Sequence, residues 1–212
     1  MKKIKVLIAD DHSVVRHGLT QILSKTSDLL VVEEAENGNE VLEKIRTIDV
    51  DVILMDIEMP GKSGLETLMQ LKTISPKLPV LILSIFPEDH YGIRLLKAGA
   101  AGYLTKTSAP EQLVEAIRSV AQGGKFISPH LAEKLVMDLD KDTDKPLHEA
   151  LSGREFQVFC MIASGEKLKD IADELSVGIT TVSTHRARIL EKMNMKTNAE
   201  LIHYALKNGL VS

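Results

Sequence analysis

Aromatic side chains are scarce in this sequence. It has no tryptophan, and aromatic residues make up 3% of its 212 residues. Hydrophobic residues nevertheless reach 44% and charged residues 26%, which is ordinary for a globular protein that buries a core. The cores must therefore be built mainly from isoleucine, leucine, valine, alanine and methionine. The length is more than one domain usually needs and suits two.

Cysteine and long apolar runs are scarce as well. Cys160 is the only cysteine, which excludes an internal disulfide. No run of about 18 apolar residues occurs, so we expect no membrane-spanning segment. The sequence starts with a strand-like run rather than a secretory or transit signal, and we expect a cytoplasmic protein.

A strong basic excess is also absent, because the formal net charge is −4. By itself this argues weakly against nucleic-acid binding. The distribution of charge along the sequence is more informative. Residues 147–212 hold eight basic and eight acidic side chains, so the negative excess lies in residues 1–146. Within 183–196, four cations face a single acid, Glu191, and this small cationic patch suits contact with phosphates.

Short apolar runs alternate with amphipathic segments over the first 125 residues. The runs predict strands at 5–9, 30–34, 52–55, 80–84 and 102–104. The segments predict helices at 13–25, 38–47, 64–74, 88–98 and 110–122. Such alternation is typical of an α/β fold, here a doubly wound, flavodoxin-like, five-stranded parallel sheet with helices on both faces.

The pattern changes after residue 125. A short helix is expected from Ser128-Pro129 to about Met137, and the charged run 138–146 has too few large apolar residues to order itself, which predicts a linker. From there on four helices fit, at 152–164, 168–175, 179–193 and 198–208. We predict a first domain over 1–124, a short helix and linker over 125–146, and an all-α four-helix domain over 147–212.

Polar groups stand at the ends of four predicted strands. Asp10 and Asp11 follow the first strand, Asp56 the third, Ser84 ends the fourth and Lys106 follows the fifth. Because the carboxyl ends of parallel strands meet at one rim, these five side chains should converge. An isolated acidic pair would usually be a solvated loop or a helix cap. Three crowded carboxylates instead favour a hard dication such as Mg²⁺, and with a lysine and a hydroxyl they suit phosphoryl transfer.

The order and spacing of these residues are those of a known domain. They are Asp10-Asp11, the run Asp56-Ile57-Glu58-Met59-Pro60-Gly61-Lys62-Ser63-Gly64, Ser84, and Gly102-Tyr103-Leu104-Thr105-Lys106. Residues 4–122 thereby resemble a receiver domain of the response-regulator superfamily. One departure is Thr107 after the lysine, where many receivers have proline, so no cis peptide is implied.

The resemblance to receivers implies a role for each matching residue. Asp56 would be the phosphoacceptor for a sensor histidine kinase, and Lys106 would pair with the phosphate. Ser84 and Tyr103 match the family's switch hydroxyl and switch aromatic. The implied Mg²⁺ ligands are Asp10, Asp11, Asp56 and the backbone carbonyl of Glu58. By contrast, His12, His17 and His90 have no metal-ligand spacing with a second soft ligand, and we interpret them as surface or helix-capping residues.

The helical part of the sequence contains a helix-turn-helix pattern. Residues 152–155 read as a capping box, and the short turn 176–178 joins two predicted helices. On the second of these, Val182, Ile189 and Met193 form an apolar stripe, and short or polar residues near its start would fit a DNA major groove. Spacing alone leaves a generic four-helix bundle with a solvated face equally open.

Several segments of this part match one DNA-binding family. They are Leu151–Glu155, Ile162–Gly165, Lys169–Ala172, Leu175–Val177, Thr181–Arg186, Ile189–Met193 and Ala199–Leu201. Residues 151–208 thereby resemble the LuxR-type DNA-binding domain of the NarL/FixJ class. The resemblance implies that Ser183, Thr184 and Ala187 face bases and that phosphates are held by Lys169, Thr181, Arg186, Arg188 and Lys192. Gly178 and Ser183 depart from the usual Ser and Lys, which weakens contact with the DNA backbone.

Together the two resemblances predict a DNA-binding transcriptional response regulator that is not an enzyme. Phosphorylation of Asp56 would promote homodimerisation and binding to double-stranded promoter DNA, with RNA polymerase as a candidate partner. Two alternatives stay open. A haloacid-dehalogenase-type phosphatase would use Asp56 as a transient nucleophile with Glu58 two positions later, although the cap insertion usual in that class is missing. A LuxR-type receptor for a diffusible signal would need an aromatic-lined pocket, against which the 3% aromatic content speaks.

Overall fold

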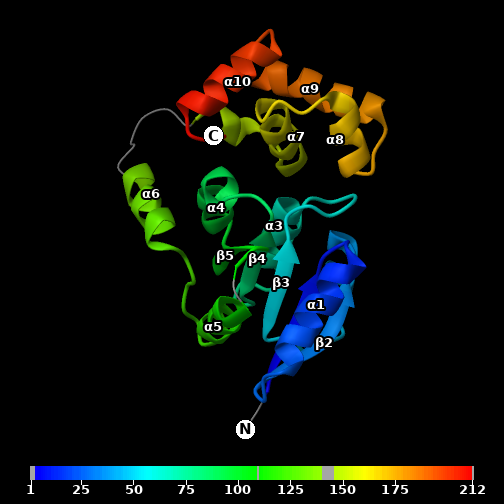
Figure 1. Ribbon diagram of the computed structural model, residues 1–212, viewed down its shortest axis with the longest axis vertical. Coiled ribbons are helices and arrows are strands. Elements are labelled where there is room, and N and C mark those ends of the chain that lie inside the picture. The colour runs from blue at the N-terminus through cyan, green and yellow to red at the C-terminus, as the bar shows by residue number, and fades with distance from the viewer. Residues whose placement is uncertain (1–2, 109, 140–145, 212) are drawn as a thin grey trace. The chain divides into compact units, whose positions relative to one another are not determined.

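The computed structural model describes residues 3–108, 110–139 and 146–211. The chain forms two compact units, Met1–Glu133 and Lys134–Ser212. The first is a parallel sheet with helices around it, and the second is built from helices (Figure 1). The predicted fold class, a doubly wound α/β domain followed by an all-α helix-turn-helix domain, is confirmed.

Five parallel strands form the sheet of the first unit. They are β1 (Ile4–Ala9), β2 (Leu29–Ala35), β3 (Val52–Asp56), β4 (Val80–Ser84) and β5 (Gly102–Thr105), in the spatial order β2-β1-β3-β4-β5. All residues of β3 and β4 are buried, as their continuous apolar runs require. The chain progresses in opposite directions from β1, so the carboxyl ends of β1 and β3 border the crevice in which such sheets bind ligands.

Five helices cover the two faces of the sheet. They are α1 (Ser13–Ser24), α2 (Gly38–Lys44), α3 (Gly64–Ile74), α4 (Glu88–Lys97) and α5 (Pro110–Ala121). Leu23 of α1 and Ile117 of α5 belong to one buried cluster with Val6 and Leu54 of the strands. Side chains alternate along a strand, so buried neighbours such as Ile53 point to the opposite face, which is left to α2, α3 and α4.

The segment after α5 stays with the first unit. Phe126 makes an isolated parallel bridge to Gly102 of β5. Helix α6 (Pro129–Leu139) begins shortly afterwards, and its Leu131 is fully buried over Gly92 of α4. These apolar contacts explain why the first compact unit extends past residue 124, to Glu133. Of the predicted linker, residues 140–145 lie outside the described part of the chain.

The second unit contains the four predicted helices and a short 3₁₀ helix that was not predicted. The elements are η1 (Leu147–Ala150), α7 (Gly153–Ala163), α8 (Leu168–Glu174), α9 (Ile179–Lys192) and α10 (Asn198–Lys207). Helix α7 is buried along its whole length, and the rings of Phe156 and Phe159 pack at 5.9 Å. The predicted capping box at Ser152 and Glu155 is present. None of the described helices is long and apolar enough to span a membrane.

Candidate functional site

Three carboxylates converge at the carboxyl ends of β1 and β3. The side chains of Asp10 and Asp56 are almost fully buried, with 1% and 2% of their residue surfaces exposed, and Asp11 is half-buried. One oxygen from each of the three and one ring nitrogen of His12 all lie within 4.8 Å of one another. The structure therefore brings together the acidic residues that the sequence placed on one rim.

Lys106 reaches this acidic cluster from the end of β5. Its Nζ lies 2.6 Å from Asp10 Oδ2 and donates a hydrogen bond to Asp56 Oδ2 at 2.7 Å. The sheet register fixes its position, because the Lys106 N–H donates to the Ser84 carbonyl oxygen at 2.7 Å. Burial opposes the charge of Lys106, but Asp56 and Asp10 together hold its pKa above the ordinary value. The ammonium therefore stays charged and partly neutralises the two acids.

The two oxygens of Asp56 have unequal surroundings. Oδ2 is held by Lys106, whereas Oδ1 is buried and makes no hydrogen bond. Burial raises the pKa of Asp56 to about 6, even though Lys106 acts in the opposite direction, and the neighbouring Asp10 adds to the rise. One carboxylate oxygen is thus desolvated and unpaired beside a cation. Such an oxygen gains by binding a metal ion or by attacking an electrophile.

The loop that follows Asp56 is folded back tightly onto its own strand. The Gly64 N–H donates to the Ile57 carbonyl oxygen at 2.9 Å. A Cβ atom at Gly64 would lie 2.6 Å from both the Asp56 carbonyl oxygen and Ile57 Cα, which is closer than packing allows. Ser63 and Glu66 form a capping box at the start of the following helix α3, in which each side chain accepts a hydrogen bond from the backbone N–H of the other residue. The glycine and the cap therefore fix the loop that directly follows the phosphoacceptor candidate.

Ser84 and Tyr103 lie on neighbouring strands and are linked through Phe86. Ser84 is fully buried, and its Oγ accepts a hydrogen bond from the Phe86 N–H at 3.1 Å. The Tyr103 hydroxyl donates to the Phe86 carbonyl oxygen at 2.8 Å. Burial raises the pKa of Tyr103, so its hydroxyl remains a neutral donor. The residues matched to the switch hydroxyl and switch aromatic thus share one backbone segment.

Arg16 supports the acidic cluster and was missed by the sequence reasoning. Its buried guanidinium donates to the Asp10 carbonyl oxygen at 2.8 Å, to Glu34 Oε2 at 3.0 Å and to Glu36 Oε1 at 2.5 Å. Burial opposes its charge, but the hydrogen bonds that Arg16 donates to both glutamates raise its pKa. The two acids at the carboxyl end of β2, Glu34 within the strand and Glu36 just after it, and the pairing of β2 with β1 were the available signal for this contact.

His12 was interpreted as a surface or capping residue, and its position at the acidic cluster was also missed. It precedes α1 but makes no side-chain cap hydrogen bond. Its side chain is 67% exposed, and Nδ1 lies 2.8 Å from Asp11 Oδ1 and 3.3 Å from Asp10 Oδ1. His17 is exposed and contacts Gln21 at 3.2 Å, away from the acids. The side chain of His90 lies outside the described part of the chain.

The second candidate surface is formed by α8, α9 and the turn between them. Helix α8 ends with Ser176 in the left-handed region, at φ +51°, and the Val177 N–H closes onto the Ala172 carbonyl oxygen at 2.9 Å. Val182 and Ile189 bury one side of α9. The exposed residues of these two helices include Lys169, Thr181, Ser183, Thr184, Ala187 and Arg188. Lys192 at the end of α9 is exposed as well, so seven of the eight residues matched to DNA contacts are open to solvent.

Two of the eight, Arg186 and Lys192, are bonded within the domain. Arg186 Nε donates to Asn198 Oδ1 at 2.6 Å, and Lys192 Nζ donates to Glu155 Oε2 at 2.6 Å. Burial acts to raise the pKa of Glu155, but the bonds from Lys192 and Ser152 outweigh it and lower that pKa. Both cations thus tie α9 to the first turn of another helix, a structural role that the sequence did not reveal.

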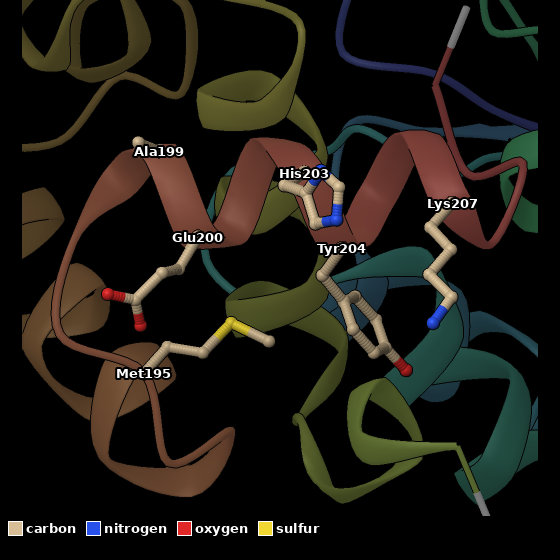
Figure 2. Close-up of a pocket in the computed structure, with 6 residues that line it drawn as sticks. All are labelled: Met195, Ala199, Glu200, His203, Tyr204 and Lys207. Carbon is tan, nitrogen blue, oxygen red and sulfur yellow. The ribbon is translucent and has the colours of Figure 1, made fainter.

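A shallow hollow runs along α10. Figure 2 shows its lining side chains on the helix and on the turn before it, and they are Met195, Ala199, Glu200, His203, Tyr204 and Lys207. Tyr204 is half-buried, and its hydroxyl lies 3.0 Å from His148 Nδ1 of η1. This contact joins η1 to α10. It explains why a 3₁₀ helix forms here although the local sequence does not predict one.

Comparison with known proteins assigns a family to each unit. Residues 6–118 match the response regulator receiver domain, and residues 149–205 match the bacterial regulatory proteins of the luxR family. The two matches cover the carboxylate cluster and the helix-turn-helix described above.

Three relatives match along nearly the whole chain. Response regulator GacA of Pseudomonas aeruginosa is 40% identical over 210 residues and covers 98% of both chains. Response regulator UvrY of Escherichia coli K12 is 36% identical over 208 residues, with 98% of this chain and 95% of UvrY covered. The response regulator RcsB of Salmonella typhimurium has a similar structure, with a TM-score of 0.60, 25% identity and coverage of 98% and 100%. A structure of an RcsB–DNA complex gives the same identity and TM-score and covers 100% of both chains. The chain belongs to the two-component response regulators that join a receiver domain to a LuxR-type DNA-binding domain.

Proposed function

We propose that a sensor histidine kinase phosphorylates this regulator on Asp56. The observation that carries the proposal is Asp56 Oδ1, a buried carboxylate oxygen without a hydrogen bond, next to Asp10, Asp11 and Lys106. The Asp56 carboxylate attacks the phosphorus of the kinase phosphohistidine, a P–O bond forms and the P–N bond breaks, so the phosphoryl group passes to Asp56. Lys106, already 2.7 Å from Asp56, pairs with the phosphate.

Mg²⁺ is the metal ion that we propose for this reaction. Asp10, Asp11 and Asp56 offer hard oxygen ligands within 4.8 Å of one another, and we assign the backbone carbonyl of Glu58 as a further ligand. When bound, the ion neutralises charge on the transferring phosphoryl group. The unpartnered buried oxygen of Asp56 fits such an ion, because a buried polar atom left without a partner is unfavourable.

Ser84 and Tyr103 are the proposed switch residues. A phosphate on Asp56 offers new acceptor oxygens to the Ser84 hydroxyl, which now accepts from Phe86. Because Tyr103 donates to the same Phe86 backbone, movement of that segment changes the surroundings of both residues. A local charge change at Asp56 thereby reaches the face of the receiver formed by β5.

Helix α9 is the proposed DNA recognition helix. Its residues opposite the buried stripe are open to solvent, and the RcsB relative has been solved as a complex with DNA. We propose that bases face Ser183, Thr184 and Ala187 and that phosphates are held by Lys169, Thr181, Arg186, Arg188 and Lys192. The internal bonds of Arg186 and Lys192 leave Lys169 and Arg188 as the cations most open to DNA.

The working form that we propose is a cytoplasmic homodimer on promoter DNA. Phosphorylation promotes dimerisation, and two symmetric half-sites about 10 base pairs apart suit a two-fold dimer on one face of the duplex. RNA polymerase is a candidate partner at the promoter. We propose no turnover of small substrates, although Glu58, two positions after Asp56, is the acid that a phosphatase of the alternative class would use.

Labelling with a small phosphoryl donor tests this proposal. Acetyl phosphate and Mg²⁺ should add one phosphate to the wild type, through an acid-stable and base-labile bond, and none to Asp56→Asn. Asp49→Asn is a matched control, since Asp49 is an exposed carboxylate paired with Lys5 at 2.9 Å. Intact-mass measurement gives the number of phosphates added to each protein. Undiminished labelling of Asp56→Asn would refute Asp56 as the phosphoacceptor. Multiple turnovers of a chromogenic phosphate ester would favour the phosphatase instead.

A further inference from the structure

We propose that His12 gives the acidic cluster a preference for first-row transition-metal dications, such as Mn²⁺, Co²⁺ and Ni²⁺, over Mg²⁺. The proposal rests on the proposed function in one respect, namely that the cluster holds a dication. What it adds is a nitrogen ligand, which changes the kind of ion that binds best. Imidazole is a good ligand for these metals, whereas Mg²⁺ prefers oxygen.

The imidazole lies where a ligand would lie. Its Nδ1 is 2.8 Å from Asp11 Oδ1 and 3.3 Å from Asp10 Oδ1. Adjacent ligands of an octahedral ion with bonds of about 2.1 Å are ~3.0 Å apart. Asp11 Oδ1 is buried and accepts no hydrogen bond, so it has lone pairs to offer to an ion. The nitrogen and the two oxygens have the mutual spacing that one shared ion requires.

Lys106 leaves this side of the cluster free for an ion. It engages Oδ2 of Asp10 and Oδ2 of Asp56. The Oδ1 atoms of Asp10, Asp11 and Asp56 are not among its contacts, and the Oδ1 of Asp56 is buried without a hydrogen bond. Three carboxylate oxygens and one imidazole nitrogen therefore form a mixed donor set around one region.

The exposure of His12 makes this contact adjustable. With 67% of its side chain exposed and no cap hydrogen bond to keep, the ring turns at little cost to the fold. Nδ1 binds a metal through its lone pair in the neutral ring, while the other ring nitrogen keeps its proton. A neutral donor also adds no repulsion to a site that already holds the Lys106 ammonium.

Calorimetric titration of the full-length protein with MgCl₂ and with NiCl₂ tests the inference. His12→Ala and His12→Asn should each weaken Ni²⁺ binding about tenfold or more, a loss typical for removal of a group that supports a metal, and change Mg²⁺ affinity by less than about threefold. Asparagine is a good helix cap, so the second variant keeps α1 intact. His17→Ala is the matched control, because His17 is exposed on α1, the helix that His12 precedes, but contacts Gln21. It should leave both affinities unchanged.

The outcomes separate this inference from the proposed function. Unchanged Ni²⁺ binding in both His12 variants, or an equal loss of Ni²⁺ and Mg²⁺ affinity, would overturn the role of His12. The proposed function survives either result as long as Mg²⁺ binds the wild type and Asp56→Asn weakens it. If the wild type bound no Mg²⁺ that depended on Asp56, the proposed metal site itself would be wrong.

Discussion

Asp56 carries a charge that its surroundings disfavour. Burial raises its pKa to about 6, above the value in the unfolded chain, so the folded state binds a proton more readily. For an acid with a raised pKa, the destabilising contribution is absent below about pH 4 and complete above about pH 6. The phosphoacceptor candidate thus costs stability near neutral pH, a cost that an ion or a phosphate would offset.

Asp56→Asn should accordingly be more stable than the wild type at pH 7 without divalent ions. A rise of about two pKa units corresponds to an upper limit of about 3 kcal/mol, and Lys106 keeps Asp10 as its partner in the variant. The advantage should shrink as the pH falls from 6 to 4, because Asp56 then becomes protonated in the folded wild type. Urea unfolding across this range measures it. A variant less stable at pH 7, with a difference independent of pH, would contradict the interpretation.

Substitutions of Lys192 and Arg188 should have different effects, the first mainly on stability and the second mainly on DNA binding. Lys192 is bonded to Glu155, whose side chain is 4% exposed, while the Lys192 side chain is 40% exposed. Lys192→Ala should lower the free energy of unfolding by about 1 kcal/mol, since solvent screens the pair but the buried acid loses a donor. Arg188→Ala should change stability by less than about 0.5 kcal/mol and flatten the salt dependence of DNA binding by about one unit. Thermal unfolding and anisotropy titrations measure the two effects, and an unchanged melting temperature for Lys192→Ala would count against the structural role.

At the scale of elements, the contact between α4 and α6 explains a glycine in the middle of a helix. Glycine there costs about 1 kcal/mol relative to alanine. A Cβ at Gly92, however, would lie 2.8 Å from both Cδ atoms of the buried Leu131. Gly18 of α1 is a matched contrast, because nothing lies within 4 Å of its would-be Cβ.

Alanine should therefore have opposite effects at these two glycines. Gly18→Ala should stabilise the protein by up to about 1 kcal/mol, and Gly92→Ala should destabilise it by about 1–3 kcal/mol through overpacking. Leu131→Ala should recover part of the Gly92→Ala loss, so the pair should be non-additive. Urea unfolding of the four variants is the measurement. Equal stabilisation by both alanines would show that Leu131 does not constrain α4.

Most helices and strands could be predicted, because the spacing of apolar residues along the chain is a local signal. The ends of α3 and β4 agree to the residue, whereas the helix predicted at 38–47 ends at Lys44. What escaped prediction depends on partners distant in sequence. Helix η1 is held by His148 against Tyr204, and Arg16 contacts one acid at the end of the next strand and another just after it. The helical position of Lys192 showed a cation away from the apolar stripe, but nothing local placed Glu155 beside it.

The candidate site divides in the same way. Its five convergent groups follow from parallel strands that end at one rim, so the strand pattern alone predicts that Asp56 and Lys106 lie together. The place of His12 in the cluster could not be predicted in this way. A search for metal-ligand spacing along the chain does not consider that His12 directly follows two acids that meet Asp56 from another strand. The sign and cause of the Asp56 pKa shift likewise depend on burial, which only the packed fold sets.

At the scale of the whole molecule, each unit has its own core. In the second unit α7 is buried along its length, and Phe156, Val182 and Ile189 are fully buried. A fragment covering 147–212 keeps η1 and all four helices and should therefore fold alone. If the receiver acts by restraining this module, the intact chain should bind DNA less well than the fragment until Asp56 is modified.

The fragment 147–212 should bind a target duplex without any phosphoryl donor, with an affinity that falls as salt rises. The full-length protein should bind the same duplex more tightly when beryllofluoride and Mg²⁺ are added, whereas full-length Asp56→Asn should not respond, because the analogue attaches to that carboxylate. Fluorescence anisotropy of one labelled duplex compares all three proteins, and circular dichroism shows whether the fragment is helical. If a folded fragment bound no DNA at low salt and high concentration, DNA binding would require the receiver, and the separate-module description of this regulator would fail.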